Sequence, residues 1–338
     1  MKVATISGIK TSTIIEQPTP KAAANYALVK ILAAPMCTEV AAWQQGSLSN
    51  SLGHEAAGEV VEAPRGSRVT VGSRVVVMPQ NGCGVCDLCV AGEHIRCQAP
   101  RNTTADTGST NGRATFAQYC IQQDWLLYSV PDDVPMLHAA MACCGLGPTF
   151  NATKVMNVRS GDLLLISGLG AVGLGGVING VLRGARVIGL ESNTWRAELA
   201  LKLGAEAVFD PQSPTALDEI LAYTNGKGAD KSIEASSAES APSFLVQATR
   251  INGEVTTVGW GGAMNACDIL RRGVTVRGAW HWNHLRDAGE MRNTLRMAAP
   301  LLDAFITHTF PLTSVQDAWA VQETGQCGKV VLLPWESL

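Results

Sequence analysis

Residues 163–182 contain no charged side chain, and this stretch restricts the possible folds more than any other feature of the sequence. It is long enough for a membrane-spanning helix, which needs about 20 apolar residues. Its glycines, at positions 168, 170, 173, 175, 176 and 180, are dense for such a helix. The first part, LLLIS, has the composition of a strand, and the later part has that of a helix. We therefore interpret the stretch as a buried strand, a tight turn and a helix.

The turn within this stretch reads GLGAVG and has the glycine spacing of dinucleotide-binding proteins. The first glycine permits the tight turn, the second lets a pyrophosphate approach the backbone, and the third lets helix and strand pack closely. The helix N-terminus stabilises the phosphate charge. The pattern therefore predicts cofactor contacts from Gly168, Gly170, Ala171, Val172 and Gly173.

An acid, Glu191, ends the next predicted strand about 20 residues further on, where such proteins bind the adenosine ribose. A carboxylate there accepts hydrogen bonds from both ribose hydroxyls and repels a 2′-phosphate, so it favours NAD. Ser192 follows, where an NADP site often has an arginine. Arg196 is the counter-argument, although it can equally line the ribose. We expect NAD and keep NADP as the alternative.

The rest of the chain indicates a mixed α/β protein. From about residue 160, the predicted strands LLLIS, RVIGLE, AVFD, KSIEA, EVTTVGW and VTVRGAW alternate with helical segments. This alternation predicts a doubly wound parallel sheet with crossover helices. Short β-type runs separated by Gly, Pro and Asn fill the first half, and similar runs return near the end. We therefore expect a β-rich domain over residues 1–152, completed by about 290–338, and a nucleotide-binding domain over 153–289.

Four cysteines form the most specific pattern in the chain. Tetrahedral zinc takes four soft ligands, and short Cys-x-x-Cys steps fold a loop around it. Four thiolates leave no open position for a substrate, so this set predicts a structural zinc site held by Cys83, Cys86, Cys89 and Cys97.

Composition excludes several other classes of protein. The formal net charge of -3 gives no general attraction to nucleic acid or to an anionic membrane. Hydrophobic residues at 46% and charged residues at 16% are typical of a folded, soluble protein. The start, MKVATISGIK, lacks the pattern of a secretory signal, so we expect the protein to be located in the reducing cytoplasm. In a reducing compartment, clustered cysteines are more often metal ligands than disulfide partners.

A second set of candidate metal ligands is dispersed along the sequence. Cys37 ends the run VKILAAPMC, His54 and Glu55 lie in LGHEAAGEVVE, and Cys144 lies in MACCGLGPTFNAT. Any one of these residues alone is more often part of a core than of a metal site.

Three motifs together resemble the zinc-containing medium-chain alcohol and polyol dehydrogenases. They are LGHEAAGEV, the GCGVCDLC segment with its later cysteine, and GLGAVG, and they occur in the family's order over nearly the whole chain. The resemblance implies a GroES-like catalytic domain, a Rossmann domain and a catalytic zinc in the cleft between them. It also implies two zinc ions per subunit and a homodimer or homotetramer.

The resemblance assigns a role to each dispersed residue. Cys37, His54 and Cys144 match the catalytic zinc ligands, and Glu55 matches an acid that sits behind the zinc or transiently binds it. The third ligand is Cys144 rather than Cys143, because the family's aromatic–polar–Ala phrase then falls on residues 150–152. In the cofactor site, the family pattern implies contacts from Glu191, Arg196, Val258 and Gly259.

The proton relay departs from the family pattern. The family usually has one residue between the first ligand and the Ser or Thr that relays the alcohol proton, but here Thr38 follows Cys37 directly. Either Thr38 still reaches the substrate through a local bulge, or Glu39 takes that place. The loop from Cys37 to His54 is also somewhat short, which could reshape the substrate pocket.

The implied chemistry is hydride transfer between an alcohol and NAD. Two thiolates and an imidazole leave a fourth zinc position for the substrate oxygen, where zinc lowers the pKa of the alcohol. A loop with Trp280, His281 and Trp282 looks similar to the substrate loop of the polyol branch, and an aromatic pair in the core or at a dimer interface is the alternative. Enzymes of that branch generally have Glu where Cys144 stands. Alcohols, polyols and amino alcohols such as threonine all remain open, as does an NADP-linked aldehyde or ketone reductase. A non-catalytic, zinc-stabilised NAD sensor is the alternative from another class.

Overall fold

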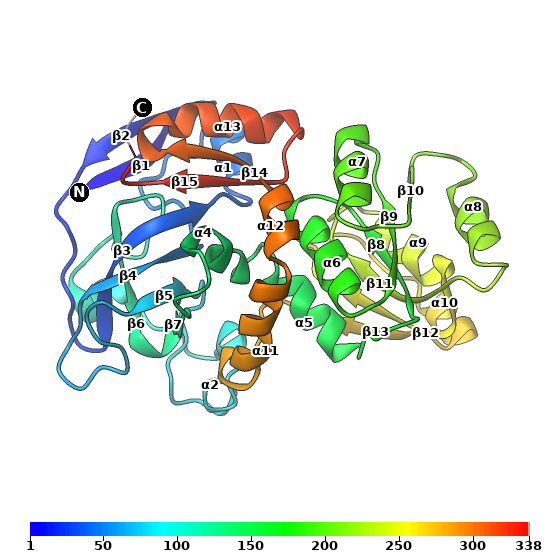
Figure 1. The fold of residues 1–338 in the computed structure, drawn as a ribbon, viewed down its shortest axis with the longest axis horizontal. Helices are drawn as coiled ribbons and strands as arrows, with labels where there is room; N and C mark the ends of the chain where they lie inside the picture. The colour runs from blue at the N-terminus through cyan, green and yellow to red at the C-terminus, as the bar shows by residue number, and fades with distance from the viewer. Residues whose placement is uncertain (337–338) are drawn as a thin grey trace. The chain divides into compact units, whose positions relative to one another are not determined.

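The computed structural model describes residues 1–336, and its contacts divide the chain into two units. The first unit contains residues 1–144, 283–296 and 306 onward, and the second contains 145–282 and 297–305. Figure 1 shows the second unit mainly in the green and yellow part of the colour range. The sequence indicated boundaries at 152/153 and 289/290, which differ from these by several residues.

The second unit is built on a six-stranded sheet in the order β10-β9-β8-β11-β12-β13. Every neighbouring pair of strands is parallel. This is the doubly wound Rossmann order, which was expected from the alternation of strands and helices. The strands are β8 (Leu163–Ser167), β9 (Arg186–Leu190), β10 (Ala207–Phe209), β11 (Ala229–Glu234), β12 (Thr249–Thr257) and β13 (Thr275–Gly278).

Helices connect these strands, as parallel pairing requires. The connecting helices are α6 (Ala171–Leu182), α7 (Thr194–Lys202), α8 (Ala216–Tyr223), α9 (Ala241–Ala248) and α10 (Ala266–Arg272), and the unit also contains α5 (Gly147–Val155) and α12 (Ala299–Phe305). The charge-free stretch forms β8, a turn and α6, which confirms the strand–turn–helix interpretation. Within residues 1–336, no helix combines the length and the apolar character that a membrane span requires.

The boundary between the units is set by packing of the segment before α5. An added Cβ at Gly175 of α6 would lie 1.8 Å from the carbonyl oxygen of Gly145, so the two backbones touch. The side-chain amide of Asn179, also in α6, donates to the carbonyl of Leu146 at 3.0 Å. These contacts place residues 145–152 with the second unit.

The first unit contains a seven-stranded, mainly antiparallel sheet in the order β14-β15-β3-β4-β5-β7, with β6 paired to β3. A two-stranded hairpin of β1 (Lys2–Gly8) and β2 (Thr11–Glu16) accompanies it. The other strands are β3 (Tyr26–Pro35), β4 (Ala56–Glu62), β5 (Arg74–Val77), β6 (Tyr119–Gln123), β7 (Leu127–Ser129), β14 (Ile306–Pro311) and β15 (Lys329–Leu333). Residues 119–129 form two strands, β6 and β7, rather than one continuous strand.

Short helices complete the first unit. They are α1 (Val40–Gln45), α2 (Asp87–Val90), α3 (Thr103–Thr107), α4 (Met136–Ala139), α11 (His284–Met297, all but its last residue) and α13 (Val315–Thr324), with 3-10 turns η1 (His94–Arg96), η2 (Asp124–Leu126), η3 (Ala140–Ala142) and η4 (Leu312–Ser314). Trp43 of α1 stacks on Trp319 of α13 at 6.1 Å, and Phe116 packs on the same ring. This core joins the C-terminal segment to the N-terminal half of the chain.

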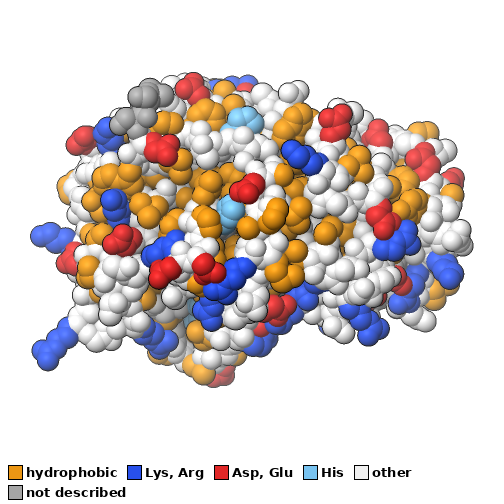
Figure 2. All heavy atoms as spheres, in the orientation of Figure 1, with side chains coloured by type: hydrophobic (Ala, Val, Ile, Leu, Met, Phe, Trp, Pro, Cys, Tyr) orange, Lys and Arg blue, Asp and Glu red, His pale blue; other side chains and the backbone are white. Residues whose placement is uncertain are grey.

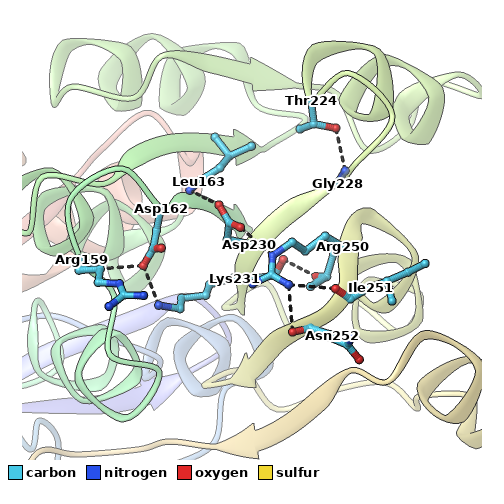
Figure 3. Close-up of polar contacts among 12 residues, drawn as sticks. Arg159, Asp162, Leu163, Thr224, Gly228, Asp230, Lys231, Arg250, Ile251 and Asn252 are labelled. Atoms are coloured by element: carbon cyan, nitrogen blue, oxygen red, sulfur yellow. Dashed lines mark hydrogen bonds and ion pairs between the residues drawn. The ribbon is translucent and has the colours of Figure 1, made fainter.

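At the amino ends of the parallel strands, two ion pairs connect β8, β11 and β12 (Figure 3). Lys231 donates to the carboxylate of Asp162 at 2.6 Å and to the carbonyl of Asn157 at 2.8 Å. Asp230 accepts from the amide of Leu163 at 2.9 Å and from the guanidinium of Arg250 at 2.7 Å. These contacts stabilise the amino ends of the strands, whereas ligands in such folds bind at the carboxyl ends. Elsewhere, charges of both signs are interspersed on the face shown in Figure 2.

Candidate metal and cofactor sites

The four cysteines of the predicted structural site lie together in the lobe around α2. Sγ of Cys83 is 3.9 Å from Sγ of Cys89, and Sγ of Cys86 is 3.9 Å from Sγ of Cys97. A tetrahedral zinc with bonds of about 2.3 Å places its sulfurs about 3.8 Å apart. The distances are too long for disulfides, whose sulfurs lie about 2.05 Å apart. The lobe therefore fits one tetrahedral ion and no substrate.

Backbone amides support thiolates in this lobe. Hydrogen bonds from backbone amides, those of Gln98 and Cys89, lower the pKa of Cys86 to about 6. The amides of Val85 and Cys86 likewise lower the pKa of Cys83. Burial raises the pKa of Cys89 to about 12. The lobe thus favours the thiolate form of Cys83 and Cys86, whereas Cys89 requires the positive charge of a bound metal to ionise.

Two residues that the sequence did not single out hold the lobe in place. The side-chain amide of Asn283 donates to the carbonyl of Ala91 at 2.6 Å. His284 lies 2.7 Å from the carbonyl of Trp125 and stacks on His94, with the ring centres 5.0 Å apart. Both follow directly after the Trp280–Trp282 segment, so that segment leads into a lobe contact.

The dispersed residues come together in the first unit. The ligand atoms of Cys37, His54, Glu55 and Cys144 all lie within 4.8 Å of one another. Cys37 follows β3 and Glu55 precedes β4, and these strands pair antiparallel with Ala33 opposite Ala57. Nε2 of His54 lies 3.3 Å from Sγ of Cys144. Two thiols, an imidazole and a carboxyl group at this spacing fit a zinc ion.

Of the two adjacent cysteines, only Cys144 belongs to this cluster. The thiol of Cys143 donates to the carbonyl of Val77 in β5 at 3.3 Å and is completely buried. Burial raises the pKa of Cys143 well above its usual range. The hydrogen bond between Cys37 and Cys144 lowers the pKa of Cys37 and raises the pKa of Cys144.

Glu39 contacts the imidazole of His54. Oε1 of Glu39 lies 2.6 Å from Nδ1 of His54. Burial lowers the pKa of His54, but hydrogen bonds with Cys37 and Glu39 outweigh it and raise the pKa to about 11. A histidine that binds metal through one nitrogen usually has such a partner on the other. Glu39 is therefore engaged with His54, and of the two relay candidates only the exposed Thr38 keeps its side chain outside this pair.

Glu55 is completely buried and held by two partners. Oε1 accepts from Nζ of Lys329 at 2.8 Å, and Oε2 accepts from the amide of Cys144 at 3.0 Å. Burial raises the pKa of Glu55 to about 7, and the nearby Lys329 ammonium opposes this rise. Lys329 gave no signal in the sequence as a site residue, because a lysine is rarely this buried.

The glycine-rich turn has the geometry that its sequence predicted. Gly168 has a φ of +82°, and an added Cβ there would lie 2.5 Å from Ser236. A Cβ at Gly173 would lie 1.8 Å from the carbonyl of Gly168, so helix α6 packs directly against the turn. At Gly170, the first residue before α6, an added Cβ would meet no atom within 4 Å. The turn therefore leaves space at the helix N-terminus, as a bound pyrophosphate requires.

A pocket of about 270 Å³ lies beside this turn, lined among others by Glu191, Arg196, Pro211 and Phe244. Glu191 accepts from the amides of Leu169 and Asn193, at 2.8 and 2.9 Å. Nε of Arg196 is buried and has no hydrogen-bond partner within residues 1–336. An acid, an arginine and apolar side chains thus all line this pocket.

The other predicted contacts fall at the carboxyl ends of the strands. The amides of Val258 and Gly259, which follow β12, both donate to the carbonyl of Glu234, at 2.8 and 3.1 Å. Trp280 follows β13, is 40% exposed and packs edge-on against Trp260 at 5.1 Å. Trp260 was missed, although it lies directly after predicted residues.

The two residues that follow Trp280 are buried rather than exposed. Trp282 is 2% exposed and packs edge-on against Phe150 at 5.9 Å, so it is a core residue. His281 is 4% exposed, and its carbonyl accepts from the side chain of Asn151 at 3.1 Å. Of the predicted substrate loop, only Trp280 is open to a small molecule.

Comparison with known proteins agrees with this geometry. Residues 23–132 match the alcohol dehydrogenase GroES-like domain, and residues 171–299 match the zinc-binding dehydrogenase family. L-threonine 3-dehydrogenase of Pyrococcus horikoshii is 29% identical over 338 residues, covering 95% of this chain and 94% of the relative. The uncharacterized zinc-type alcohol dehydrogenase-like protein YphC of Escherichia coli is 28% identical over 291 residues, covering 83% and 80%. The chain belongs to the zinc-containing medium-chain alcohol dehydrogenase family.

Solved structures share the fold over nearly the full length. Alcohol dehydrogenase TADH from Thermus sp. ATN1 superimposes with a TM-score of 0.89 at 21% identity, covering 98% of this chain and 99% of that one. The 2R,3R-butanediol dehydrogenase from Bacillus subtilis gives 0.81 at 22% identity, covering 98% and 99%. The expected combination of a GroES-like domain and a Rossmann domain is confirmed. The family models and the curated relatives show that the protein is an oxidoreductase that acts on a small molecule.

Proposed function

We propose that this protein is a zinc-dependent dehydrogenase that transfers a hydride between a primary or secondary alcohol and NAD. The observation that carries the proposal is the cluster of Cys37, His54 and Cys144, with the fourth candidate ligand, Glu55, held by other groups. Three protein ligands with an open position are typical of a catalytic zinc, and four are typical of a structural one. The chain offers one site of each kind.

Each candidate site residue has its own role in the proposed hydride transfer. When bound, zinc would act as a Lewis acid that lowers the pKa of the alcohol, and NAD would accept the hydride. His54 is held in one orientation by Glu39, so that Nε2 faces the thiols. Thr38 carries an exposed hydroxyl next to Cys37 and can pass the alcohol proton to solvent. In the second unit, the turn around Gly170 and Glu191 would hold the pyrophosphate and the adenosine ribose.

The cofactor is proposed to be NAD because Glu191 ends β9 at the pocket wall. Its carboxylate repels the extra phosphate of NADP and keeps lone pairs free to accept from ribose hydroxyls. The unpartnered Nε of Arg196 in the same wall favours the alternative, an NADP-linked aldehyde or ketone reductase of the same fold. Binding of NAD and NADP measured side by side distinguishes the two.

The substrate is an alcohol, polyol or amino alcohol. Several relatives are named L-threonine 3-dehydrogenase, so threonine is the first amino alcohol to test. The exposed pair of Trp260 and Trp280 at the carboxyl ends of β12 and β13 supplies an apolar surface near the ligand-binding edge of the sheet. Such a surface favours an alcohol with an apolar or ring-shaped face.

The decisive experiment combines a metal count with a substrate panel. We expect two zinc ions per chain and NAD-dependent oxidation of at least one among threonine, butanediol, benzyl alcohol and sorbitol. One zinc per chain and no turnover with either cofactor would instead support a zinc-stabilised NAD sensor.

We also propose that the protein forms homodimers or homotetramers. Strand β13 lies at the end of the six-stranded sheet, and all four of its residues are exposed. An exposed edge strand presents unpaired backbone groups that can pair with a second chain. Light scattering on the wild type and on Val276→Pro tests this, because proline removes the amide that such pairing needs. We expect a smaller particle for the variant.

A further inference from the structure

Lys329 is a completely buried lysine beside the metal-ligand cluster. It begins β15, and the backbone fixes this strand next to Cys37. Val331 of β15 pairs with Pro35 at the end of β3, and the amide of Met36 donates to the carbonyl of Val330 at 2.9 Å. The position of Lys329 is therefore set by the sheet rather than by a flexible loop.

The buried ammonium group forms an ion pair with a buried carboxylate. Nζ of Lys329 lies 2.8 Å from Oε1 of Glu55, and both side chains have an exposed fraction of 0%. The other oxygen of Glu55 accepts from the amide of Cys144 at 3.0 Å. Both oxygens of Glu55 are thus engaged, although the residue lies within 4.8 Å of the other three candidate ligands.

We propose that Lys329 is a positioning residue that holds the Glu55 carboxylate away from the metal and so keeps the fourth coordination position open to substrate. The inference rests on the proposed zinc site at Cys37, His54 and Cys144. A carboxylate is an ordinary zinc ligand, and a site with four protein ligands is closed to substrate. Lys329 and the metal therefore compete for the same carboxylate.

The expected effect of removing the charge follows from burial. Without the ammonium group, the buried carboxylate of Glu55 has lost its ion-pair partner, and the metal is a cation within its reach. It should then leave the Cys144 amide and bind the metal. Lys329→Arg keeps the charge and should keep the site open, whereas Lys329→Met fills the same volume without the charge.

Cobalt(II) in place of zinc reports this difference, because its visible absorption weakens when coordination rises from four to five. Azide added to the cobalt protein reports whether a position is open. In Lys329→Met we expect weaker visible absorption and azide binding reduced at least about tenfold. Lys329→Arg should resemble the wild type. Lys231→Met is the matched control, because it removes another buried, paired lysine in the second unit and should leave both cobalt signals unchanged.

Several outcomes separate this inference from the proposed function. A folded Lys329→Met protein with wild-type absorption and azide affinity overturns the role of Lys329. If that variant does not fold, Glu55→Gln is compared with Glu55→Gln/Lys329→Met, in which the buried charge is absent. Equal azide affinities support the proposal, and a tenfold difference between them overturns it. A wild type that binds only one cobalt, insensitive to Cys144→Ser, contradicts the proposed zinc site itself.

Discussion

Nδ1 of His54 lies 2.6 Å from Oε1 of Glu39, fifteen residues earlier in the chain. The contact fixes the imidazole so that its other nitrogen faces Cys144. Glu39→Ala should therefore lower the affinity of this site for zinc by about 10–100-fold, the usual effect of losing a partner of a ligand histidine. Competition with a chelator measures the loss, and the four-cysteine lobe serves as the internal reference. Equal affinities in the variant and the wild type would show that Glu39 does not support the ligand.

The four-cysteine lobe should contribute to stability more than to chemistry. Cys97→Ser removes one of its ligands, and metal binding energy in such a lobe is folding energy. We expect the Tm to fall by at least about 4 °C, which corresponds to one or two kcal/mol in a protein of this size. Cys267→Ser changes an exposed cysteine outside the lobe and should leave the Tm unchanged. A stable Cys97→Ser protein without metal in the lobe contradicts the structural role.

Glu191 should decide between NAD and NADP. Glu191→Ala removes the acceptor for the ribose hydroxyls, and hydrogen bonds to a charged group contribute about 1.5–3 kcal/mol each. We expect the Kd for NAD to rise about 10–100-fold and the preference over NADP to shrink. Glu191→Gln, which keeps an acceptor oxygen, should lose less affinity. Should the wild type use NADP tenfold more efficiently than NAD, the role given to Glu191 is wrong.

The sequence predicted those parts of the fold that depend on local pattern. The run LLLIS forms β8, and the glycines after it set the turn before α6, because an added Cβ would meet backbone atoms at Gly168 and Gly173 and Gly170 leaves space. The break between β6 and β7 has no such local signal, since it depends on the buried Asp124, whose carboxylate accepts from the hydroxyl of Ser67 and the amide of Arg68. These contacts join segments 56 and 57 residues apart, and no local pattern encodes them.

In the candidate site too, the sequence predicted some residues, and others are revealed only by their tertiary contacts. Its thiols and imidazole were found because metal ligands are few in kind. The role of Glu39 was left open, because only the structure shows its contact with His54. Lys329 could not be found, since nothing in GKVVLL distinguishes a buried lysine from an exposed one. Trp282 was placed in the substrate site by resemblance, and packing against Phe150 removes it.

The ion pair of Asp162 with Lys231 should give the second unit a pH-dependent stability (Figure 3). Burial raises the pKa of Asp162, but the hydrogen bond from Lys231 outweighs it, and the pKa lies below its usual value. A depressed pKa contributes stability that is present above the unfolded pKa of about 3.9 and is lost as the pH falls through the folded pKa.

Asp162→Asn should therefore reduce the free energy of unfolding by about 1–3 kcal/mol at pH 7. The difference from the wild type should shrink below about pH 3, where the carboxyl group of the wild type is protonated too. Denaturant unfolding at both pH values measures it. Asp133→Asn breaks an exposed pair with Arg296 and should cause no measurable change. A difference that stays constant from pH 7 to pH 3 contradicts the electrostatic origin.

The adjacent cysteines provide the sharpest test of the catalytic site. Cys144→Ala should weaken or lose one zinc per chain, while the four-cysteine lobe keeps its own. Turnover should collapse, because the remaining ligands no longer hold the site in the geometry that positions the substrate oxygen. Binding of NAD should survive, since Gly170 and Glu191 belong to the other unit.

Cys143→Ala is the control within the same turn. Cys143 is buried and donates only to the carbonyl of Val77, so its loss should cost about 1 kcal/mol of stability and leave the zinc content unchanged. Zinc analysis and turnover of the two variants together decide the assignment. If Cys143→Ala is the inactive, zinc-poor variant, the third ligand is Cys143 rather than Cys144. If both variants stay active, either Glu55 or a water molecule completes the metal site in place of Cys144, and a polyol becomes the favoured substrate.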